Sequence, residues 1–244
     1  MARVRETTLI VIPAFNEEAS VASVIEDVHK HAPQVSVLVV SDGSHDQTVR
    51  VAQSAGATVA SLPYNLGVGG AMRVGFAYAV ANGYANVVQV DADGQHDAAD
   101  LPRLIEALGT CDLAIGARFA GVGAYRASGP RWWAMLFLSK VLSRIAHTEL
   151  RDTTSGFRAS GPRAVALFAE HYPAEYLGDT VESLVIAAKA DLVIRQVPVS
   201  MRERQAGEAS HRPFKAALFL GRVGLAMFFA LIRPSVVRKK GRTK

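Results

Sequence analysis

Residues 86–96 read NVVQVDADGQH, and this stretch decides the class of fold that the sequence predicts. Its first half is a continuous apolar and β-branched run, which is typical of a strand buried on both faces of a sheet. Its second half places Asp91 and Asp93 on alternate residues immediately after that strand. Two carboxylates at a strand end can converge on one Mg²⁺ or Mn²⁺ ion, because both cations prefer oxygen ligands. Gln95 adds an amide oxygen and His96 an imidazole.

Strand and helix patterns alternate on both sides of this stretch. Apolar runs predict strands at residues 8–13, 35–40, 58–61, 86–90, 112–117 and 192–199. Helical patterns occur at residues 17–31, 44–55, 71–82, 100–108, 132–145 and 174–190. Such alternation predicts an α/β fold with a mostly parallel, Rossmann-like central sheet and helices on both faces.

Polar side chains collect where the predicted strands end. Asn16 and Glu17 follow the first strand, Asp42 follows the second, and the aspartate pair follows the fourth. Arg118 follows the next strand along the chain. In parallel sheets, ligands bind beyond the carboxyl ends of the strands. We therefore expect one binding site at this edge of the sheet.

Two turns near this edge have residues that suit a nucleotide. Gly43 permits a tight turn, and the Asp42 carboxylate can accept hydrogen bonds from the N–H groups of uracil or guanine. The alternative is that Asp42 or Ser44 is an ordinary helix cap. Residues 65–70 (NLGVGG) resemble a phosphate-cradling loop at a helix start, but they lack the lysine of a P-loop. A flexible connection is an equal alternative for them.

The composition is that of a folded protein in a reducing compartment. Of 244 residues, 50% are hydrophobic and 20% are charged, which is sufficient for a sizeable core. Cys111 is the single cysteine, so no intrachain disulfide can form, and a buried structural role is expected. The opening residues, MARVRETTLIVIP, hold too short an apolar run for a signal peptide. We expect the protein to be made and kept in the cytosol.

The end of the chain has a different character. Residues 214–232 are strongly apolar but are interrupted by Lys215 and Arg222, so an amphipathic helix in a membrane interface is favoured over a spanning or a core helix. The basic tail at 233–244 contains no acid and would attract phosphates of lipid or nucleic acid. Aromatic and basic residues do not interleave outside the tail, so we expect no nucleic-acid partner.

A set of motifs occurs in a fixed order along the chain. They are PAFNEE (13–18), SDGSHD (41–46), NLG (65–67), DADGQH (91–96), GARF (116–119) and DTTSGFR (152–158). Together they resemble family 2 glycosyltransferases, in the branch similar to dolichyl- or polyprenyl-phosphate mannose and glucose synthases. The resemblance covers residues 8–212. It divides the chain into a catalytic domain at 1–212 and a membrane-peripheral segment at 213–244.

The resemblance implies an A-type glycosyltransferase fold, inversion at the anomeric carbon, and a GDP- or UDP-hexose donor bound with Mg²⁺ or Mn²⁺. Asp91, Asp93 and Gln95 match the metal-binding stretch of the family. The residues that match donor-binding positions are Pro13, Ala14, Asn16, Glu17, Asp42, Gly43, Asn65, Gly70, Asp91, Ala92, Asp93, Gln95, Arg202 and Arg204. Among these, Asp42 matches a contact to the base, and Arg202 and Arg204 match a mobile loop that closes over the diphosphate.

The resemblance also implies a polyprenyl-phosphate acceptor at the cytosolic face of a membrane. Asp93, Arg118 and Arg131 are the expected catalytic residues, with Arg118 on the acceptor phosphate and Arg131 and Ser139 as looser matches to further phosphate contacts. A bound cation and arginines would neutralise the departing nucleoside diphosphate. Because a phosphate monoester is already anionic at neutral pH, no strong base is then needed.

Two other enzyme classes stay open at this point. A family 2 enzyme that glycosylates a saccharide hydroxyl, in cell-surface polysaccharide or glycolipid synthesis, would need a carboxylate base, for which Asp179 and Glu182 are candidates. A nucleotidyltransferase also uses paired aspartates, but it should have basic residues near the N-terminus, and residues 13–18 contain none. Ser41 stands where many relatives have aspartate, and residues 132–133 (WW) stand where relatives are often more basic. The sugar, the lipid and the oligomeric state are not encoded in these motifs.

Overall fold

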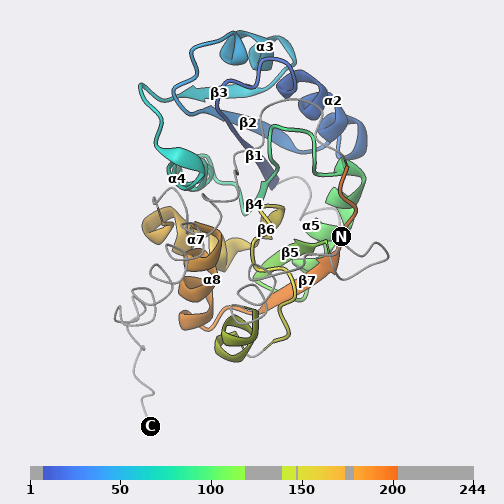
Figure 1. Ribbon diagram of the computed structural model, residues 1–244, viewed down its shortest axis with the longest axis vertical. Coiled ribbons are helices and arrows are strands. Elements are labelled where there is room, and N and C mark those ends of the chain that lie inside the picture. The colour runs from blue at the N-terminus through green and yellow to red at the C-terminus, as the bar shows by residue number, and fades with distance from the viewer. Residues whose placement is uncertain (1–7, 119–138, 147, 174–178, 203–244) are drawn as a thin grey trace, which may run out of the picture.

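The computed structural model describes residues 8–118, 139–146, 148–173 and 179–202 (Figure 1). The strands are β1 (Thr8–Ala14), β2 (Ser36–Ser41), β3 (Thr58–Ser61), β4 (Asn86–Gln89), β5 (Leu113–Ala117), β6 (Arg158–Ser160) and β7 (Ile194–Pro198). The helices are α2 (Val21–His31), α3 (Thr48–Ser54), α4 (Gly67–Ala81), α5 (Leu101–Ala107), α7 (Pro162–His171) and α8 (Asp179–Lys189), with a short 3₁₀ turn η1 (Ala98–Asp100).

The strands form one mixed sheet in the order β3-β2-β1-β4-β6-β5-β7. β1 pairs in parallel with β2 and β4, β2 with β3, and β5 with β7. β6 is the exception, since it runs antiparallel to both β4 and β5. The predicted α/β fold with a mostly parallel sheet is therefore confirmed, and the antiparallel strand in its middle was not predicted.

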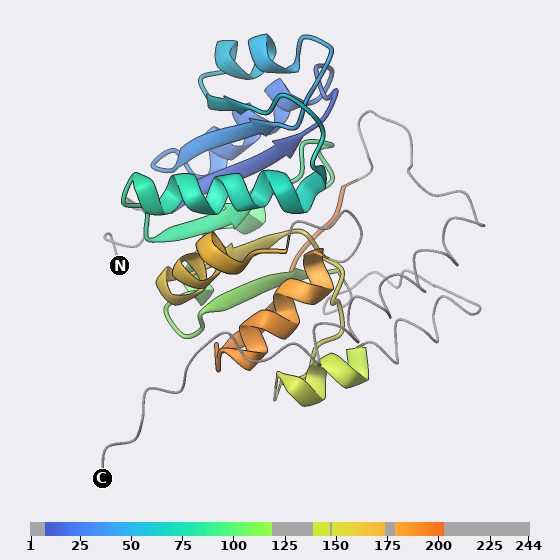
Figure 2. The ribbon, with the colours of Figure 1, turned by 90° about the vertical axis from the view of Figure 1, so that its left-hand side faces the viewer.

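Helices cover both faces of the sheet, as expected. Side chains alternate along β1, so that Leu9 and Val11 belong to the core under α4, α7 and α8. Ile10 and Ile12 belong to the opposite core, under α2, α3 and α5. Figure 2 shows the face covered by α4, α7 and α8. α4 lies especially close to the sheet at Gly75, where an added Cβ would lie only 2.6 Å from a methyl group of Val11.

Three helix starts differ from the sequence prediction. α2 begins at Val21 instead of Glu17, and α3 at Thr48 instead of Ser44. The Ser44 hydroxyl accepts hydrogen bonds from Ser41 and from the backbone of Asn16, so it does not cap α3. α4 begins at Gly67 instead of Ala71, so the glycines lie within its first turn. Of the two alternatives for residues 65–70, the helix start is the one observed, and the flexible connection is wrong.

Several predictions concern residues outside this description. Of the helix predicted at 132–145, only residues 139–145 are described, and they are helical. The predicted interfacial helix at 214–232 and the basic tail at 233–244 lie outside the described ranges. Within those ranges, no helix combines the length and apolar character needed to cross a membrane. Cys111 is buried, and burial raises the pKa of its thiol, which favours the predicted structural role.

Candidate functional site

The carboxyl ends of β1 and β2 lie side by side, because Ala14 pairs with Ser41 at the end of the parallel register. The loop after β1 is tied to the loop after β2. The Asn16 amide donates to Ser44 Oγ at 3.1 Å, and the His45 amide donates back to Asn16 Oδ1 at 2.8 Å. The Glu17 amide donates to Thr48 Oγ1 at 2.8 Å. The turn that follows Pro13 and Ala14 is therefore held in one shape.

Asp42 holds the loop after β2 to the start of α4. Its side chain is buried, and its two carboxylate oxygens accept hydrogen bonds from the amides of Leu66 at 2.7 Å and Gly67 at 2.8 Å. These are the free N–H groups of a helix N-terminus, which favours a negative charge there. Asp42 is therefore a cap, as the sequence allowed, but of α4 and not of α3. Its contact with a nucleobase stays a prediction.

Two glycines in this region permit close contacts. Gly43 has φ of +73°, and a Cβ there would lie 2.7 Å from the carbonyl carbon of Tyr64. Within the first turn of α4, a Cβ on Gly70 would lie 2.4 Å from Cβ of Leu66. Asn65 Oδ1 accepts a hydrogen bond from the Gly67 amide at 3.0 Å. Residues 65–70 thus form a compact helix start beside Asp42.

Three neighbouring groups fix the position of the Asp91 carboxylate, just after β4. Gln89 Nε2 donates to Oδ1 at 3.1 Å, and His96 Nε2 lies 3.5 Å from Oδ2. On the third side is Gly156, where a Cβ would lie 3.2 Å from each carboxylate oxygen. The side chain of Asp91 nevertheless stays 39% exposed. Its position is fixed while its oxygens remain accessible to a ligand.

His96 supports Asp91. Its Nδ1 accepts a hydrogen bond from the Asp91 amide at 3.0 Å, so a neutral ring carries its proton on Nε2, which faces the Asp91 carboxylate. The ring is buried and stacks on Phe157, with centroids 4.7 Å apart. With Nδ1 accepting a hydrogen bond and Nε2 carrying the proton, neither ring nitrogen is left to bind a metal. His96 therefore supports Asp91 and is not the metal ligand that the sequence suggested.

Asp93 and Gln95 complete the turn. Asp93 is buried, and its Oδ1 accepts a hydrogen bond from the backbone amide of Gln95 at 3.0 Å. Ala92 is also buried, and Gly94 has φ of +76°. Among the described residues, no group of three or more His, Cys, Asp or Glu side chains could hold a metal ion. The carboxylates of Asp91 and Asp93 and the side-chain oxygen of Gln95 are nonetheless the kind of ligand that Mg²⁺ or Mn²⁺ takes, because such ions keep several waters and bind substrate phosphates.

Arg118, after β5, is paired with a fully buried carboxylate. Its Nε and one terminal nitrogen donate to the two oxygens of Asp152 at 2.7 and 2.9 Å, and the same terminal nitrogen donates to Thr154 Oγ1 at 2.9 Å. Burial by itself raises the pKa of Asp152, but the hydrogen bonds and charge of Arg118 outweigh it, so the pKa is lowered. The Arg118 side chain is 34% exposed, so its guanidinium is oriented and still reaches the surface.

We expect Asp152→Asn to lower the free energy of unfolding at pH 7 by about 3 kcal/mol, because it leaves a partly buried guanidinium without its counter-charge. The lowered pKa means that the wild-type contribution is present above the unfolded-state pKa and is lost as pH falls through the folded-state value. Urea unfolding should therefore separate the two proteins at pH 7, and the difference should narrow as the pH falls below the ordinary pKa of an aspartate. The control Glu149→Gln removes an exposed pair with Arg151 and should cost at most about 1 kcal/mol. A pH-independent difference would contradict this account of Asp152.

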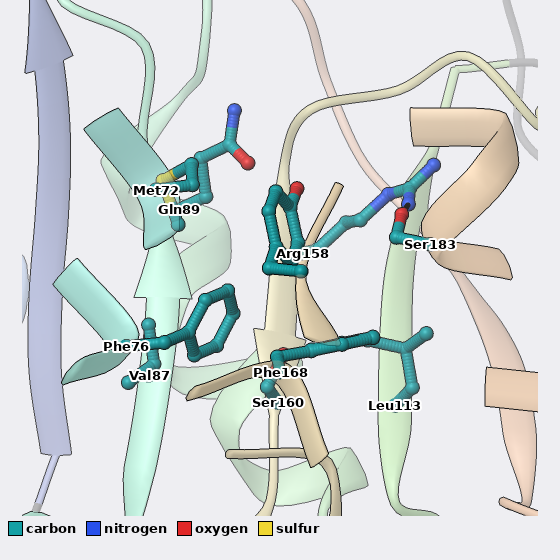
Figure 3. Close-up of a pocket in the computed structure, with 10 residues that line it drawn as sticks. Met72, Phe76, Val87, Gln89, Leu113, Arg158, Ser160, Phe168 and Ser183 are labelled. Atoms are coloured by element: carbon teal, nitrogen blue, oxygen red, sulfur yellow. Dashed lines mark hydrogen bonds between the residues drawn. The ribbon is translucent and has the colours of Figure 1, made fainter. Parts of the chain in front are cut away.

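Arg158 holds the segment that contains Asp152 and Gly156. It lines an internal pocket between α4, α7 and the central strands, and Figure 3 shows it extending toward Ser183. Its guanidinium donates to the carbonyls of Ser155 at 2.7 Å and Thr153 at 3.1 Å. It also donates to Ser183 Oγ and the Thr180 carbonyl, at the start of α8. A buried arginine thus fixes the loop that contacts both Arg118 and Asp91.

Other predicted residues lie elsewhere or outside the description. Arg131 and Arg204 are outside the described ranges. The Ser139 hydroxyl donates to the carbonyl of Leu150. Arg202 forms ion pairs with Asp27 and Asp97. No role was predicted for Gln89, Asp152, Gly156 or Arg158. The last three lie in the DTTSGFR motif, and its charged residues and glycine are the features that could have indicated them.

Known proteins resemble this chain in sequence and in fold. The family model "Glycosyl transferase family 2" matches residues 9–163. A polyprenol monophosphomannose synthase of Mycolicibacterium smegmatis is 36% identical over 65% of this chain and 63% of its own length. An undecaprenyl-phosphate mannosyltransferase of Micrococcus luteus is 31% identical over 82% of this chain and 86% of its own.

The solved structures agree on the fold. A crystal structure of glucosyl-3-phosphoglycerate synthase from Mycobacterium tuberculosis, in complex with Mn²⁺, UDP and glucosyl-3-phosphoglycerate, superposes with a TM-score of 0.68. It is 20% identical and covers 96% of this chain and 82% of that one. The likeness confirms the expected fold.

Proposed function

The chain belongs to glycosyl transferase family 2, and on that premise we propose that it transfers a hexose from a GDP- or UDP-sugar to a polyprenyl phosphate, with inversion at the anomeric carbon. The observation that supports this most directly is the framed Asp91 carboxylate, which stays accessible beside Asp93 at the end of β4. The names of the two relatives above point to a lipid-phosphate acceptor.

Asp91, Asp93 and Gln95 would hold the divalent cation in this proposal. When bound, the cation supplies neutralisation of the charge that grows on the departing nucleoside diphosphate. The protein's part is to keep Asp91 in place through Gln89, His96 and the narrow space beside Gly156. Asp93 is held by its hydrogen bond from the Gln95 amide. A site that is fixed before binding loses less free energy in reorganising.

The nucleotide would lie along the carboxyl ends of β1 and β2, next to the cation. The turn at Pro13, Ala14, Asn16 and Glu17 is rigid there because it is bonded to the loop after β2. Asp42 and Gly43 would contact the base, with Ala92 lining the site. Asn65 and Gly70 would contact the donor at the start of α4, where the backbone amides of Leu66 and Gly67 are bonded to Asp42.

Arg118 would bind the acceptor phosphate, joined by Arg131 and, as a looser match, Ser139. The bidentate pair with Asp152 sets the direction of the Arg118 guanidinium. A phosphate monoester is largely dianionic at neutral pH, so its oxygen attacks without a general base. The residues then contribute mainly by aligning two like-charged reactants and neutralising their charge. A saccharide hydroxyl acceptor would instead require a base such as Glu182.

The remaining parts of the proposal concern the location of the enzyme. Residues 1–212 would be the catalytic domain, and the apolar and basic residues of 213–244 would bind the cytosolic face of the membrane. This location places the enzyme next to a lipid acceptor and to cytosolic nucleotide sugars. The product would serve the cell envelope.

We expect one nucleotide sugar in a panel of GDP-mannose, UDP-glucose and UDP-N-acetylglucosamine to stabilise the protein far more strongly when Mn²⁺ or Mg²⁺ is present than when it is absent. At a ligand concentration of about 100 times the dissociation constant, binding adds about 2.7 kcal/mol, which raises Tm by about 5–10 °C for a chain of this size. The check is thermal denaturation with and without EDTA.

The same donor, radiolabelled, should then give an acid-labile product that partitions into organic solvent when undecaprenyl phosphate is supplied. A water-soluble product formed on a saccharide would identify the alternative acceptor. No divalent-dependent shift with any UDP or GDP compound would contradict the proposed activity altogether.

A further inference from the structure

Arg202 lies against the loop that contains the proposed metal ligands. One terminal nitrogen of its guanidinium donates to Asp27 Oδ2 in α2 at 2.8 Å, and the other donates to Asp97 Oδ1 at 2.6 Å. Its backbone amide donates to the carbonyl of Gln95 at 2.9 Å. A single residue therefore joins α2, the segment after β7 and residues 93–97, which we name the metal loop.

Neighbouring contacts extend this attachment in both directions. Met201 forms an antiparallel bridge with His96, and the Ser200 amide donates to Asp100 Oδ2 at 2.7 Å. Arg103 donates to the other oxygen of Asp100 and to the carbonyl of Pro198. Residues 198–202 thus lie beside residues 95–103, and Met201 and Arg202 are the two that bond to the metal loop itself.

The charges around Arg202 oppose its release. Its partners Asp27 and Asp97 are partly buried, with side chains 20% and 22% exposed, and the Arg202 side chain is 36% exposed. His31 also contacts Asp27, with its Nδ1 3.2 Å from Oδ1. Moving the guanidinium onto a donor diphosphate would leave two partly buried carboxylates without their shared cation and would break both ion pairs.

We infer that Arg202 is a positioning residue, which holds the metal loop against α2 and the segment after β7, and that it does not contact the donor diphosphate. This inference rests on the proposed function, because it assigns the loop a cation. It replaces the diphosphate contact that the family resemblance implied for Arg202.

The test is a double-mutant cycle between Arg202→Met and Asp97→Asn. Methionine keeps the apolar stem of the side chain, and asparagine keeps the oxygen that accepts a hydrogen bond from the Ala99 amide at 3.0 Å. Each single variant should lower the affinity for Mn²⁺ about tenfold, the smaller effect of losing a group outside the ligand shell. The double variant should be no weaker than Arg202→Met alone, because that substitution already removes the ion pair between Arg202 and Asp97.

The readouts are electron paramagnetic resonance of free Mn²⁺ during titration and calorimetry of UDP and GDP binding in EDTA. Without metal, the nucleoside diphosphate affinity of Arg202→Met should equal that of the wild type. Arg163→Met is the matched control, because it breaks an exposed arginine pair with Asp112 and should leave Mn²⁺ binding unchanged. Asp27→Asn provides a second variant, should Arg202→Met fold poorly.

Three results would overturn the inference. One is a loss of UDP or GDP affinity in EDTA on Arg202→Met while Asp97→Asn behaves as wild type, which would show a direct contact. Another is wild-type Mn²⁺ affinity in all the variants, which would leave the proposed function standing. The third is a wild-type protein that binds neither Mn²⁺ nor any nucleoside diphosphate, and that result would remove the proposed function as well.

Discussion

Asp93→Asn is expected to fold as the wild type does and to transfer sugar at least about a thousandfold more slowly. A loss of this size follows when a preorganised charge is removed from the place where charge develops in the transition state. Asparagine keeps the Oδ1 acceptor that receives the Gln95 amide at 3.0 Å, so the turn retains its hydrogen bond. What is lost is the negative charge that a divalent cation requires. The substitution therefore separates the shape of the turn from its affinity for metal.

The measurement is a radiolabelled-sugar assay at saturating Mn²⁺, with Tm recorded for each protein. Asp191→Asn is the matched control, because it neutralises an exposed aspartate just before β7, at the opposite edge of the sheet. Its φ of +54° is one that asparagine also adopts readily. Turnover by Asp93→Asn equal to that of the control would exclude this carboxylate from the reaction.

The sheet was predictable where a strand is buried on both faces. β1, β2 and β4 are continuous apolar runs with polar residues directly after them, and each was placed within two residues of its observed bounds. β6 was missed because it has only three residues, Arg158–Ser160, and begins with a charged side chain. α7 follows it at once from Pro162, and no separate pattern marked the boundary.

The predicted starts of the helices were wrong for a different physical reason. Capping depends on which side chain reaches the free amides, and for α4 that side chain is Asp42, which is 24 residues before Leu66 in the chain. Local sequence around residues 65–70 shows only glycines, which are typical of loops as well as of close helix packing. The tertiary contact decided the outcome.

The candidate site was predictable as a set of motifs and not as a set of contacts. The order of the motifs along the chain identified the family, and the family model confirms that identification. Order does not say which loops touch. Arg118 and Asp152 are separated by 34 residues, and Arg202 and Asp97 by 105, so a single sequence contains no local signal for either pair. The structure therefore assigns Asp152 and Gly156 to the site through their contacts.

Gly156→Ala is expected to lower kcat about a hundredfold, the effect of a small misplacement of a catalytic group. A Cβ at this position would lie 2.9 Å from Gln89 Nε2 and 3.2 Å from both oxygens of Asp91. The φ of Gly156 is not positive, so the backbone itself accepts alanine. Gln89 must turn away and lose its hydrogen bond to Asp91, and the carboxylate must move with it.

The protein should still fold, because the atoms that must give way are the ends of side chains, and one extra methyl group in a packed site costs about 1–3 kcal/mol of stability. Gly161→Ala makes the matched control: its Cβ would meet its nearest neighbour, the Asp112 carbonyl oxygen, at an ordinary 3.4 Å, so kcat should be unchanged. Both variants are assayed for kcat and for Mn²⁺ affinity, with Tm as the check on folding. A displaced ligand predicts that kcat and Mn²⁺ affinity fall together in Gly156→Ala alone. If Mn²⁺ affinity is retained while Tm collapses, Gly156 serves only packing, and the frame around Asp91 has no part in holding the cation.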